Sequence, residues 1–211
     1  MIFDMDGVLV DGEPLHFRAV NQLLGEEGLS ISLEDYKPYM GTKAGWGDMI
    51  RDLGLKRPVE YYAPRYDQLI LEQYRACSVP EPGAVELVRS LRSHGVPVAV
   101  ASSSRTAWVA ACLERIGLAG GFDMLVTGSD IEHGKPAPDI YLLAAERLGA
   151  DPRRCLAIED APAGIESAKA AGMTCWAVRT EYTRGLALPN PEREFARIGD
   201  IRAETIVGVA A

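Results

Sequence analysis

The sequence predicts an α/β protein, built on a doubly wound parallel sheet with an inserted block of helices. Between residues 84 and 178, short apolar runs alternate with amphipathic helical patterns, as in a parallel sheet covered on both faces. Between residues 13 and 79 the patterns are helical. Polar residues directly follow several apolar runs, which is typical of a ligand site at the carboxyl ends of parallel strands.

Composition limits the class of protein. The chain has 211 residues, 47% of them hydrophobic, and a formal net charge of −8. This length suits a moderate core with a small insertion, and the charge argues against a nucleic-acid or membrane partner. The four cysteines are widely spaced, so we expect reduced thiols and no disulfide or zinc site. With no signal peptide or membrane-length apolar run in view, we expect a cytoplasmic monomer.

The first strand is expected at residues 1–3, and two aspartates follow it, Asp4 and Asp6. A buried carboxylate costs several kcal/mol unless it is paired or bound to a cation. Two interpretations stay open. The segment is an ordinary Asx-Gly turn, or it carries a nucleophile, Asp4, and an acid–base group, Asp6, beside Mg²⁺. Gly7 would allow the sharp turn that either interpretation needs.

Helical spacing of apolar residues predicts the inserted block. Gly12 and Pro14 end the first segment, and a Pro-rich linker at residues 78–83 leads back to the sheet. The expected helices cover residues 15–27, 33–40, 45–54 and 60–76. The sequence therefore predicts a core domain of residues 1–12 and 80–211 and an inserted helical domain of residues 13–79.

The second half of the chain supplies the other strands of the predicted sheet. Apolar runs predict strands at residues 96–101, 124–127, 155–158 and 174–178. The helical stripes between them end at glycines, for example Gly149. The last thirty residues are less regular, and we expect one further short strand near residues 196–198 and a terminal helical turn.

Polar residues directly follow three of the predicted strands: the first strand and two of the later ones. Ser102 follows the strand at 96–101, and Glu159 and Asp160 follow the strand at 155–158. The carboxyl ends of parallel strands share one edge, so these groups can converge with the aspartates of the first strand. Each also has an ordinary interpretation: Ser102 as a helix N-cap, and Glu159-Asp160 as a turn before a helix.

Lys135 lies in a loop between Gly134 and Pro136, where a lysine is usually solvated. Together with the strand-end groups it suits phosphoryl transfer through a carboxyl-phosphate. Asp4 would attack phosphorus, and Asp6 would protonate the leaving oxygen and then activate water. Ser102 and the Ser103 N–H would bind phosphoryl oxygens, and Lys135 would balance negative charge.

The same edge is expected to hold Mg²⁺, because this hard ion prefers oxygen ligands. The expected ligands are the carboxylates of Asp4 and Asp160 and the backbone carbonyl of Asp6. Glu159 would hold a metal-bound water.

These motifs resemble those of the haloacid dehalogenase (HAD) superfamily. The resemblance rests on Asp4-x-Asp6-Gly7-Val8, Ser102, Lys135-Pro136 and Glu159-Asp160, and it covers essentially the whole chain. It implies a Rossmann-like core with an α-helical cap, in the branch of sugar-phosphate phosphatases and β-phosphoglucomutase. It also implies that the first aspartate is the nucleophile, the second the acid–base group, and Mg²⁺ the cofactor. Dehalogenases proper lack the second carboxylate, so Asp6 argues for phosphate chemistry.

Residues of the cap would then determine the substrate specificity. The Asp11-x-Glu13-Pro14-Leu15-His16 segment resembles the phosphatase and mutase pattern, so His16 faces the active site or is simply a polar residue of a cap helix. Further candidates, each with an ordinary alternative as a cap-core or surface residue, are Lys43, Trp46 and Arg105. In the mutase pattern, an arginine that binds a second phosphate would be expected at the position of Ala44. Its absence weighs against mutase activity.

We expect a Mg²⁺-dependent phosphatase acting on a small phosphorylated metabolite, a sugar phosphate, through an aspartyl-phosphate intermediate. The alternative enzyme is a β-phosphoglucomutase-like isomerase. A third interpretation, a non-catalytic binding protein on this fold, is disfavoured by the complete set of acidic, hydroxyl and lysine groups.

Overall fold

The computed structural model describes residues 1–36, 39 and 45–207, without the side chains of residues 45 and 46. Its centre is a six-stranded sheet in the order β3-β2-β1-β4-β5-β6, in which every neighbouring pair is parallel. The strands are β1 (Ile2–Phe3), β2 (Ala99–Ser102), β3 (Met124–Thr127), β4 (Leu156–Glu159), β5 (Thr174–Val178) and β6 (Arg193–Phe195). This confirms the predicted parallel α/β sheet.

Strand β1 lies in the middle although it is short. Ile2 pairs with Ala99 of β2 on one side and with Ala157 of β4 on the other. The chain therefore leaves β1 in one direction along the sheet and later returns to its other side. This reversal of strand order places a crevice at the carboxyl end of β1, where doubly wound folds bind ligands.

Helices cover both faces of the sheet because alternate strand residues point to opposite sides. On one face, Phe3 and Val100 share a hydrophobic cluster with α5 (Ala84–Ser93) and α6 (Thr106–Arg115). On the other, Ile2 and Ala99 share a cluster with α7 (Asp139–Arg147) and α8 (Pro162–Ala170). The last helix, α9 (Ala203–Val207), joins the first cluster through Ala203 and accounts for the predicted terminal helical turn.

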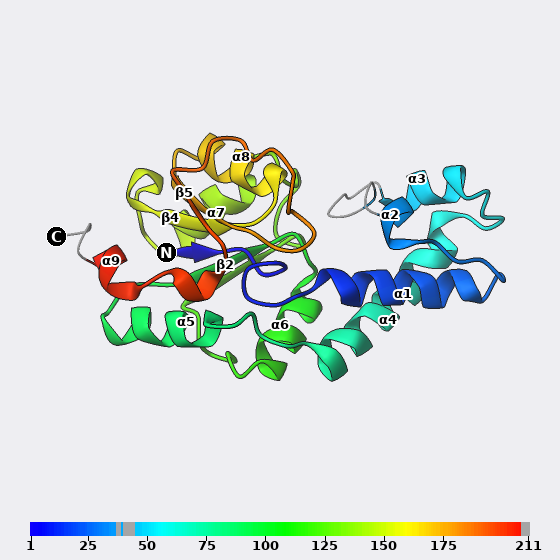
Figure 1. Ribbon diagram of the computed structural model, residues 1–211, viewed down its shortest axis with the longest axis horizontal. Coiled ribbons are helices and arrows are strands. Elements are labelled where there is room, and N and C mark those ends of the chain that lie inside the picture. The colour runs from blue at the N-terminus through cyan, green and yellow to red at the C-terminus, as the bar shows by residue number, and fades with distance from the viewer. Residues whose placement is uncertain (37–38, 40–44, 208–211) are drawn as a thin grey trace.

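The remaining helices lie beyond the carboxyl ends of the strands. Figure 1 shows the β1 arrow pointing towards α1 (Glu13–Gly25), α2 (Leu33–Tyr36), α3 (Gly45–Asp52) and α4 (Val59–Cys77). These helices have a hydrophobic cluster of their own, which includes Leu23, Tyr36 and Tyr62. The carboxyl-terminal half of α4 also packs against α6 of the sheet layer. We call α1–α4 the cap helices.

Two elements differ from the sequence expectations. The last strand is β6 at Arg193–Phe195, directly before the expected residues 196–198. The Phe195 ring packs at a tilt against Trp176 of β5, with ring centroids 5.3 Å apart, and Ile198 is buried in a short 3₁₀ turn. The helix expected over residues 33–40 ends as α2 at Tyr36, and the rest of that range mostly lies outside the described residues.

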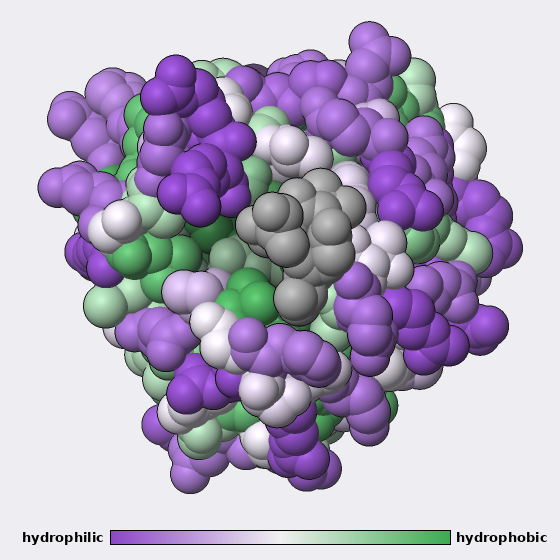
Figure 2. All heavy atoms as spheres, turned by 90° about the vertical axis from the view of Figure 1, so that its left-hand side faces the viewer, coloured by the Kyte–Doolittle hydropathy of each residue, from purple (hydrophilic) through white to green (hydrophobic). Residues whose placement is uncertain are grey.

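In the part of the chain that the structure describes, no helix combines the length and apolar character needed to cross a bilayer. Figure 2 shows the face at the amino ends of the strands, away from the cap helices. Hydrophilic side chains dominate this face, and hydrophobic residues appear in scattered groups, the largest to the left of the grey atoms. The groups suited to chemistry lie at the opposite end of the sheet.

Candidate active site

The chain turns sharply after β1, and this turn sets the positions of the two aspartates. The Asp4 N–H donates to the Ile158 carbonyl of β4 at 3.0 Å, so Asp4 still follows the strand. Gly7 then adopts a φ of 84° and its N–H donates to the Val10 carbonyl at 2.8 Å. This left-handed conformation favours glycine. The tight loop leaves Asp4 buried and Asp6 half-buried at the same edge of the sheet.

Lys135 reaches this edge and joins two carboxylates. Its Nζ lies 2.5 Å from Asp4 Oδ1 and 2.5 Å from Glu159 Oε1, and its side chain is only 10% exposed. Burial acts to lower the pKa of Lys135, but the Asp4 and Glu159 carboxylates outweigh it and raise that pKa. Lys135 is therefore held as a cation, not solvated as a loop lysine usually is.

Glu159 has both oxygens occupied. Oε1 accepts from Lys135 and, at 2.6 Å, from the Tyr141 hydroxyl of α7. Oε2 accepts from the backbone N–H groups of Asp160 at 3.1 Å and Ala161 at 3.5 Å. A carboxylate so fully bonded is suited to holding Lys135 and the loop after β4 in place.

Asp160 completes an acidic group that could hold a cation. Ligand oxygens of Asp4, Glu159 and Asp160 all lie within 4.8 Å of one another, and all three residues are buried. Burial and, after it, the Glu159 and Asp6 carboxylates raise the pKa of Asp4 to about 7, although the Lys135 cation opposes them. Burial and the neighbouring carboxylates likewise raise the pKa of Asp160 well above its usual value. Among the described residues, no side chain donates a hydrogen bond to the Asp160 carboxylate.

Glycines make room for three of these carboxylates. A Cβ on Gly7 would lie 2.2 Å from Asp160 Oδ2, and one on Gly164 would lie 2.0 Å from the Glu159 carboxyl carbon. A Cβ on Gly12 would lie 1.7 Å from Asp6 Oδ1. Since real Cβ atoms do not approach this closely, a side chain at any of these positions would displace the carboxylate beside it.

The serines after β2 lie next to Asp6. Ser102 is 1% exposed, and its hydroxyl oxygen accepts the Ser104 N–H at 3.1 Å, which leaves its own proton for another acceptor. Ser104 is also buried and donates to Asp6 Oδ2 at 3.1 Å. Ser103 is exposed. The structure thus brings Asp6 and the end of β2 together.

The cap helices also contact Asp6. The Tyr74 hydroxyl of α4 donates to Asp6 Oδ1 at 2.7 Å. His16 of α1 lies between two tyrosines, with Nε2 at 2.8 Å from the Tyr74 hydroxyl and Nδ1 at 2.5 Å from the Tyr66 hydroxyl. The Trp108 ring of α6 packs against this group, 6.1 Å from the His16 ring. His16 thus reaches Asp6 through Tyr74.

Glu13, the first residue of α1, adds another carboxyl group. Burial and, after it, the Asp6, Asp11 and Asp4 carboxylates together raise its pKa to about 8. No hydrogen bond to its side chain is found among the described residues. Glu13 is therefore a polar group at the boundary between core and cap, open to a ligand.

The other cap candidates are placed less directly. Lys43 lies outside the described residues; Trp46 is in α3, but its side chain is not described. Arg105 is exposed, pairs with Asp67 of α4 at 2.8 Å, and lies 5.8 Å from the Trp108 ring. In this arrangement Arg105 links α4 to the loop after β2.

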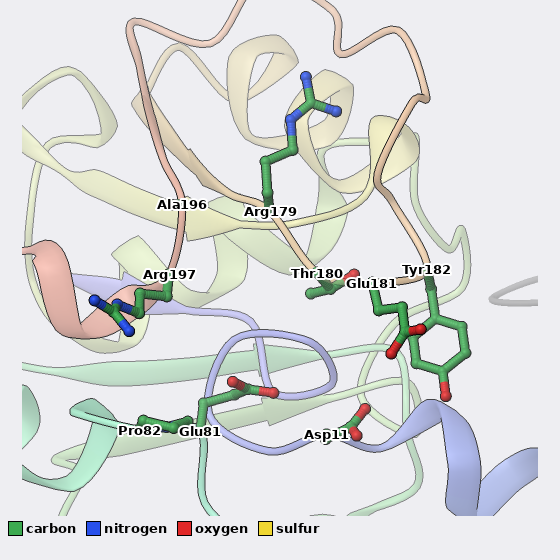
Figure 3. Close-up of a pocket in the computed structure, with 9 residues that line it drawn as sticks. All are labelled: Asp11, Glu81, Pro82, Arg179, Thr180, Glu181, Tyr182, Ala196 and Arg197. Atoms are coloured by element: carbon green, nitrogen blue, oxygen red, sulfur yellow. The ribbon is translucent and has the colours of Figure 1, made fainter.

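A separate pocket of about 220 Å³ lies beside the start of α1, with its nine lining residues labelled in Figure 3. Its cations point away from its middle and are already paired: Arg179 with Glu194 at 2.9 Å and Arg197 with Asp200 at 3.1 Å. Its carboxylates include Asp11 and Glu81, whose pKa values are raised mainly by burial. This pocket therefore does not suit an anionic substrate.

Sequence reasoning missed several residues that contact these groups: Tyr74, Tyr66, Ser104 and Tyr141. The tyrosines belong to helical stripes that read as ordinary core positions. Ser104 was the third of three serines, and nothing local distinguished it. Only the folded contacts, which join residues up to 98 positions apart, identify them.

Comparison with known proteins gives one family. The model for haloacid dehalogenase-like hydrolases matches residues 1–172. Fructose-1-phosphate phosphatase YqaB of Escherichia coli (strain K12) is 34% identical over 181 residues, which cover 85% of this chain and 95% of that protein. The crystal structure of CbbY from Rhodobacter sphaeroides in complex with phosphate has a TM-score of 0.85 and 26% identity, with 94% of each chain covered.

A longer relative contains a similar segment. Protein SUPPRESSOR OF QUENCHING 1, chloroplastic, of Arabidopsis thaliana is 37% identical over 194 residues. These residues cover 88% of this chain but only 18% of that protein.

Proposed function

The chain belongs to the haloacid dehalogenase-like hydrolase family, and from its carboxylate centre we propose that it is a Mg²⁺-dependent phosphatase of a small phosphorylated metabolite. The observation that carries this proposal is the buried group of Asp4, Glu159 and Asp160 around the Lys135 ammonium, with Asp6 beside it. Asp4 is the proposed nucleophile and Asp6 the proposed acid–base group.

Two chemical steps account for hydrolysis. An Asp4 carboxylate oxygen attacks phosphorus, the bond from phosphorus to the leaving oxygen breaks, and Asp6 gives that oxygen a proton. Water then attacks the same phosphorus, Asp6 takes its proton, and the bond to Asp4 breaks. The ammonium of Lys135 stays on Asp4 Oδ1 and offsets negative charge in both steps.

The residues present fit a divalent cation. Asp160 is a buried carboxylate without a hydrogen-bond donor among the described side chains. The three clustered carboxylates also exceed the single ammonium that they face. Asp4, Asp160 and the Asp6 carbonyl would hold the ion, since oxygen-only ligands suit Mg²⁺. Bound there, Mg²⁺ would neutralise charge on the phosphoryl group.

The proposed substrate is a sugar phosphate. This rests on the relative named fructose-1-phosphate phosphatase and on the groups at the core–cap boundary. Glu13 offers a hydrogen bond there, and a neutral, hydroxylated leaving group tolerates the surrounding carboxylates better than an anionic one. Ala44, where an arginine would clamp a second phosphate, fits the same preference.

A panel of sugar phosphates tests the proposal. With Mg²⁺ present, phosphate release from at least one sugar phosphate should exceed any interconversion of glucose 1-phosphate and glucose 6-phosphate. Asp4→Asn should abolish release, because an amide is a poor nucleophile. Isomerisation faster than hydrolysis would make the protein a mutase. Release that survives Asp4→Asn would remove the proposed nucleophile.

A further inference from the structure

Asp6 is held from two sides of the molecule. Ser104, from the loop after β2, donates to Oδ2 at 3.1 Å, and Tyr74, from cap helix α4, donates to Oδ1 at 2.7 Å. Gly12 leaves the space that Oδ1 occupies, since a Cβ there would lie 1.7 Å from this atom. The orientation of the Asp6 carboxylate therefore depends on one core hydroxyl and one cap hydroxyl.

The hydrogen bonds behind Tyr74 have a fixed direction. A carboxyl oxygen that carries no proton only accepts, so the Tyr74 hydroxyl donates its single proton to Asp6 Oδ1. This holds when Asp6 is ionised and when its transferable proton is on Oδ2. The Tyr74 oxygen must then accept from His16 Nε2, 2.8 Å away, which places a proton on Nε2. In neutral imidazole the other nitrogen, Nδ1, is then an acceptor, and Tyr66 donates to it at 2.5 Å.

The surroundings support a neutral imidazole. The rings of Tyr66, Tyr74 and Trp108 surround His16, with ring centroids 5.6 to 6.1 Å from it. Burial lowers the pKa of His16, although the Asp6 charge opposes this. A neutral imidazole can take part in the chain of hydrogen bonds only as the Nε2–H tautomer.

We propose that Tyr74 and His16 are positioning residues for Asp6, through a one-way chain of hydrogen bonds from Tyr66 to His16 to Tyr74 to the Asp6 carboxylate. Residues of α1 and α4 thus set the orientation of an acid–base group that belongs to the core. The inference rests on the proposed function, because it gives Asp6 the proton-transfer role. It makes the packing of the cap helices a requirement for proton transfer and not only for substrate binding.

The dependence on leaving group separates positioning from a general structural role. A sugar alkoxide needs a proton to leave, whereas p-nitrophenolate does not. Tyr74→Phe should therefore lower single-turnover cleavage of a sugar phosphate about 10- to 100-fold, the range expected when a reacting group is misplaced. Cleavage of p-nitrophenyl phosphate should change less than about threefold, and KM for the sugar phosphate should stay similar. Equal losses on both substrates would overturn the proposal.

Variants at His16 provide a rescue test. The amide N–H of His16→Gln can replace the Nε2–H donor to Tyr74, whereas His16→Leu offers no donor. We expect His16→Gln to retain most of the sugar-phosphate rate and His16→Leu to lose it. Tyr62→Phe is the control, because the Tyr62 hydroxyl bonds to Glu27 within the cap. Equal rates for the two His16 variants would contradict the inference.

The tautomer can be measured without any turnover. The ¹⁵N shifts of His16 at neutral pH should show a protonated Nε2 and a bare Nδ1, and a protonated Nδ1 would refute the chain. This readout needs no substituted protein, so it stands even if Tyr74→Phe fails to fold. Asp6→Asn tests the proposed function separately: full activity in that variant would remove the acid–base role of Asp6, while the tautomer would still report on the chain.

Discussion

At the scale of single residues, the carboxylates of the site differ in how many hydrogen-bond donors each of them has. Glu159 is saturated with donors, Asp4 shares one oxygen with Lys135, and Asp6 is held by two hydroxyls. Asp160 has no described donor. These differences suit different roles: support for Glu159, attack for Asp4, proton transfer for Asp6 and cation binding for Asp160.

Glu13 provides a pH-dependent prediction. Burial first, and then Asp6, Asp11 and Asp4, raise its pKa from 4.5 to about 8. The unfolded chain therefore loses this proton before the folded protein does, so stability from this group falls as pH rises between those values. Glu13→Gln should be about as stable as the parent protein at pH 4 and more stable by roughly 1–3 kcal/mol at pH 8.5.

Urea unfolding with EDTA present measures this difference without a bound cation. Glu114→Gln, an exposed change on α6, is the matched control for replacing a glutamate with glutamine. If the free energy of unfolding that Glu13→Gln gains over the parent protein is no larger at pH 8.5 than at pH 4, Glu13 is not a buried carboxyl without a compensating partner.

At the scale of elements, the start of α5 packs closely against the turn at residues 198–200, and this close packing depends on two glycines. A Cβ on Gly199 would lie 2.6 Å from the Pro82 carbonyl oxygen, and one on Gly83 would lie 2.4 Å from the Gly199 Cα. Both contacts are with backbone, which cannot move aside as a side chain can. The C-terminal segment therefore packs on the core by direct backbone contact.

Gly199→Ala should cost about 1–3 kcal/mol of unfolding free energy, the usual range for overpacking. Gly47→Ala, in α3 with no neighbour within 4 Å of the added Cβ, should instead gain about 0.5–1 kcal/mol from helix propensity. Chemical denaturation of both variants compares them, and a neutral Gly199→Ala would contradict the close approach.

Some strands could be predicted from the sequence and others could not. Apolar runs ended by polar residues located β1, β2 and β4 and their strand-end groups, because burial and alternation leave a local pattern. Strand β6 was placed too late: it has only three residues, Arg-Glu-Phe, and no apolar run. Tyr74 was missed for another reason. Its partner Asp6 is 68 residues away, and no local pattern encodes that contact.

At the scale of the whole molecule, two layers of helices and one sheet bring together groups from distant parts of the chain. Asp4 and Lys135 are 131 positions apart yet form an ion pair. The cap helices lie over this edge of the sheet (Figure 1) and contribute Tyr74 to it. Because carboxylates gather at this edge, we expect the folded protein to bind a divalent cation more tightly than the unfolded chain does.

Mg²⁺ should therefore stabilise the protein. At a Mg²⁺ concentration 100 times Kd the gain is about 2.7 kcal/mol, or roughly 5–10 °C in Tm for a chain of this size. Asp160→Asn should reduce the shift strongly, whereas Asp151→Asn, an exposed surface carboxylate, should keep it. Thermal melts with EDTA and with Mg²⁺ compare the three proteins, and an unchanged shift in Asp160→Asn would place the cation elsewhere.

Trapping a phosphorylated aspartate would test the proposed nucleophile directly. Asp6→Asn should still react with p-nitrophenyl phosphate, whose leaving group needs no proton, but should hydrolyse the intermediate slowly. Quenching this variant and reducing it with borohydride should convert residue 4 to homoserine, detectable by mass spectrometry of the N-terminal peptide. Homoserine at position 4 is the predicted result. Rapid p-nitrophenol release with an unmodified Asp4, or modification at another residue, would contradict nucleophilic attack by Asp4.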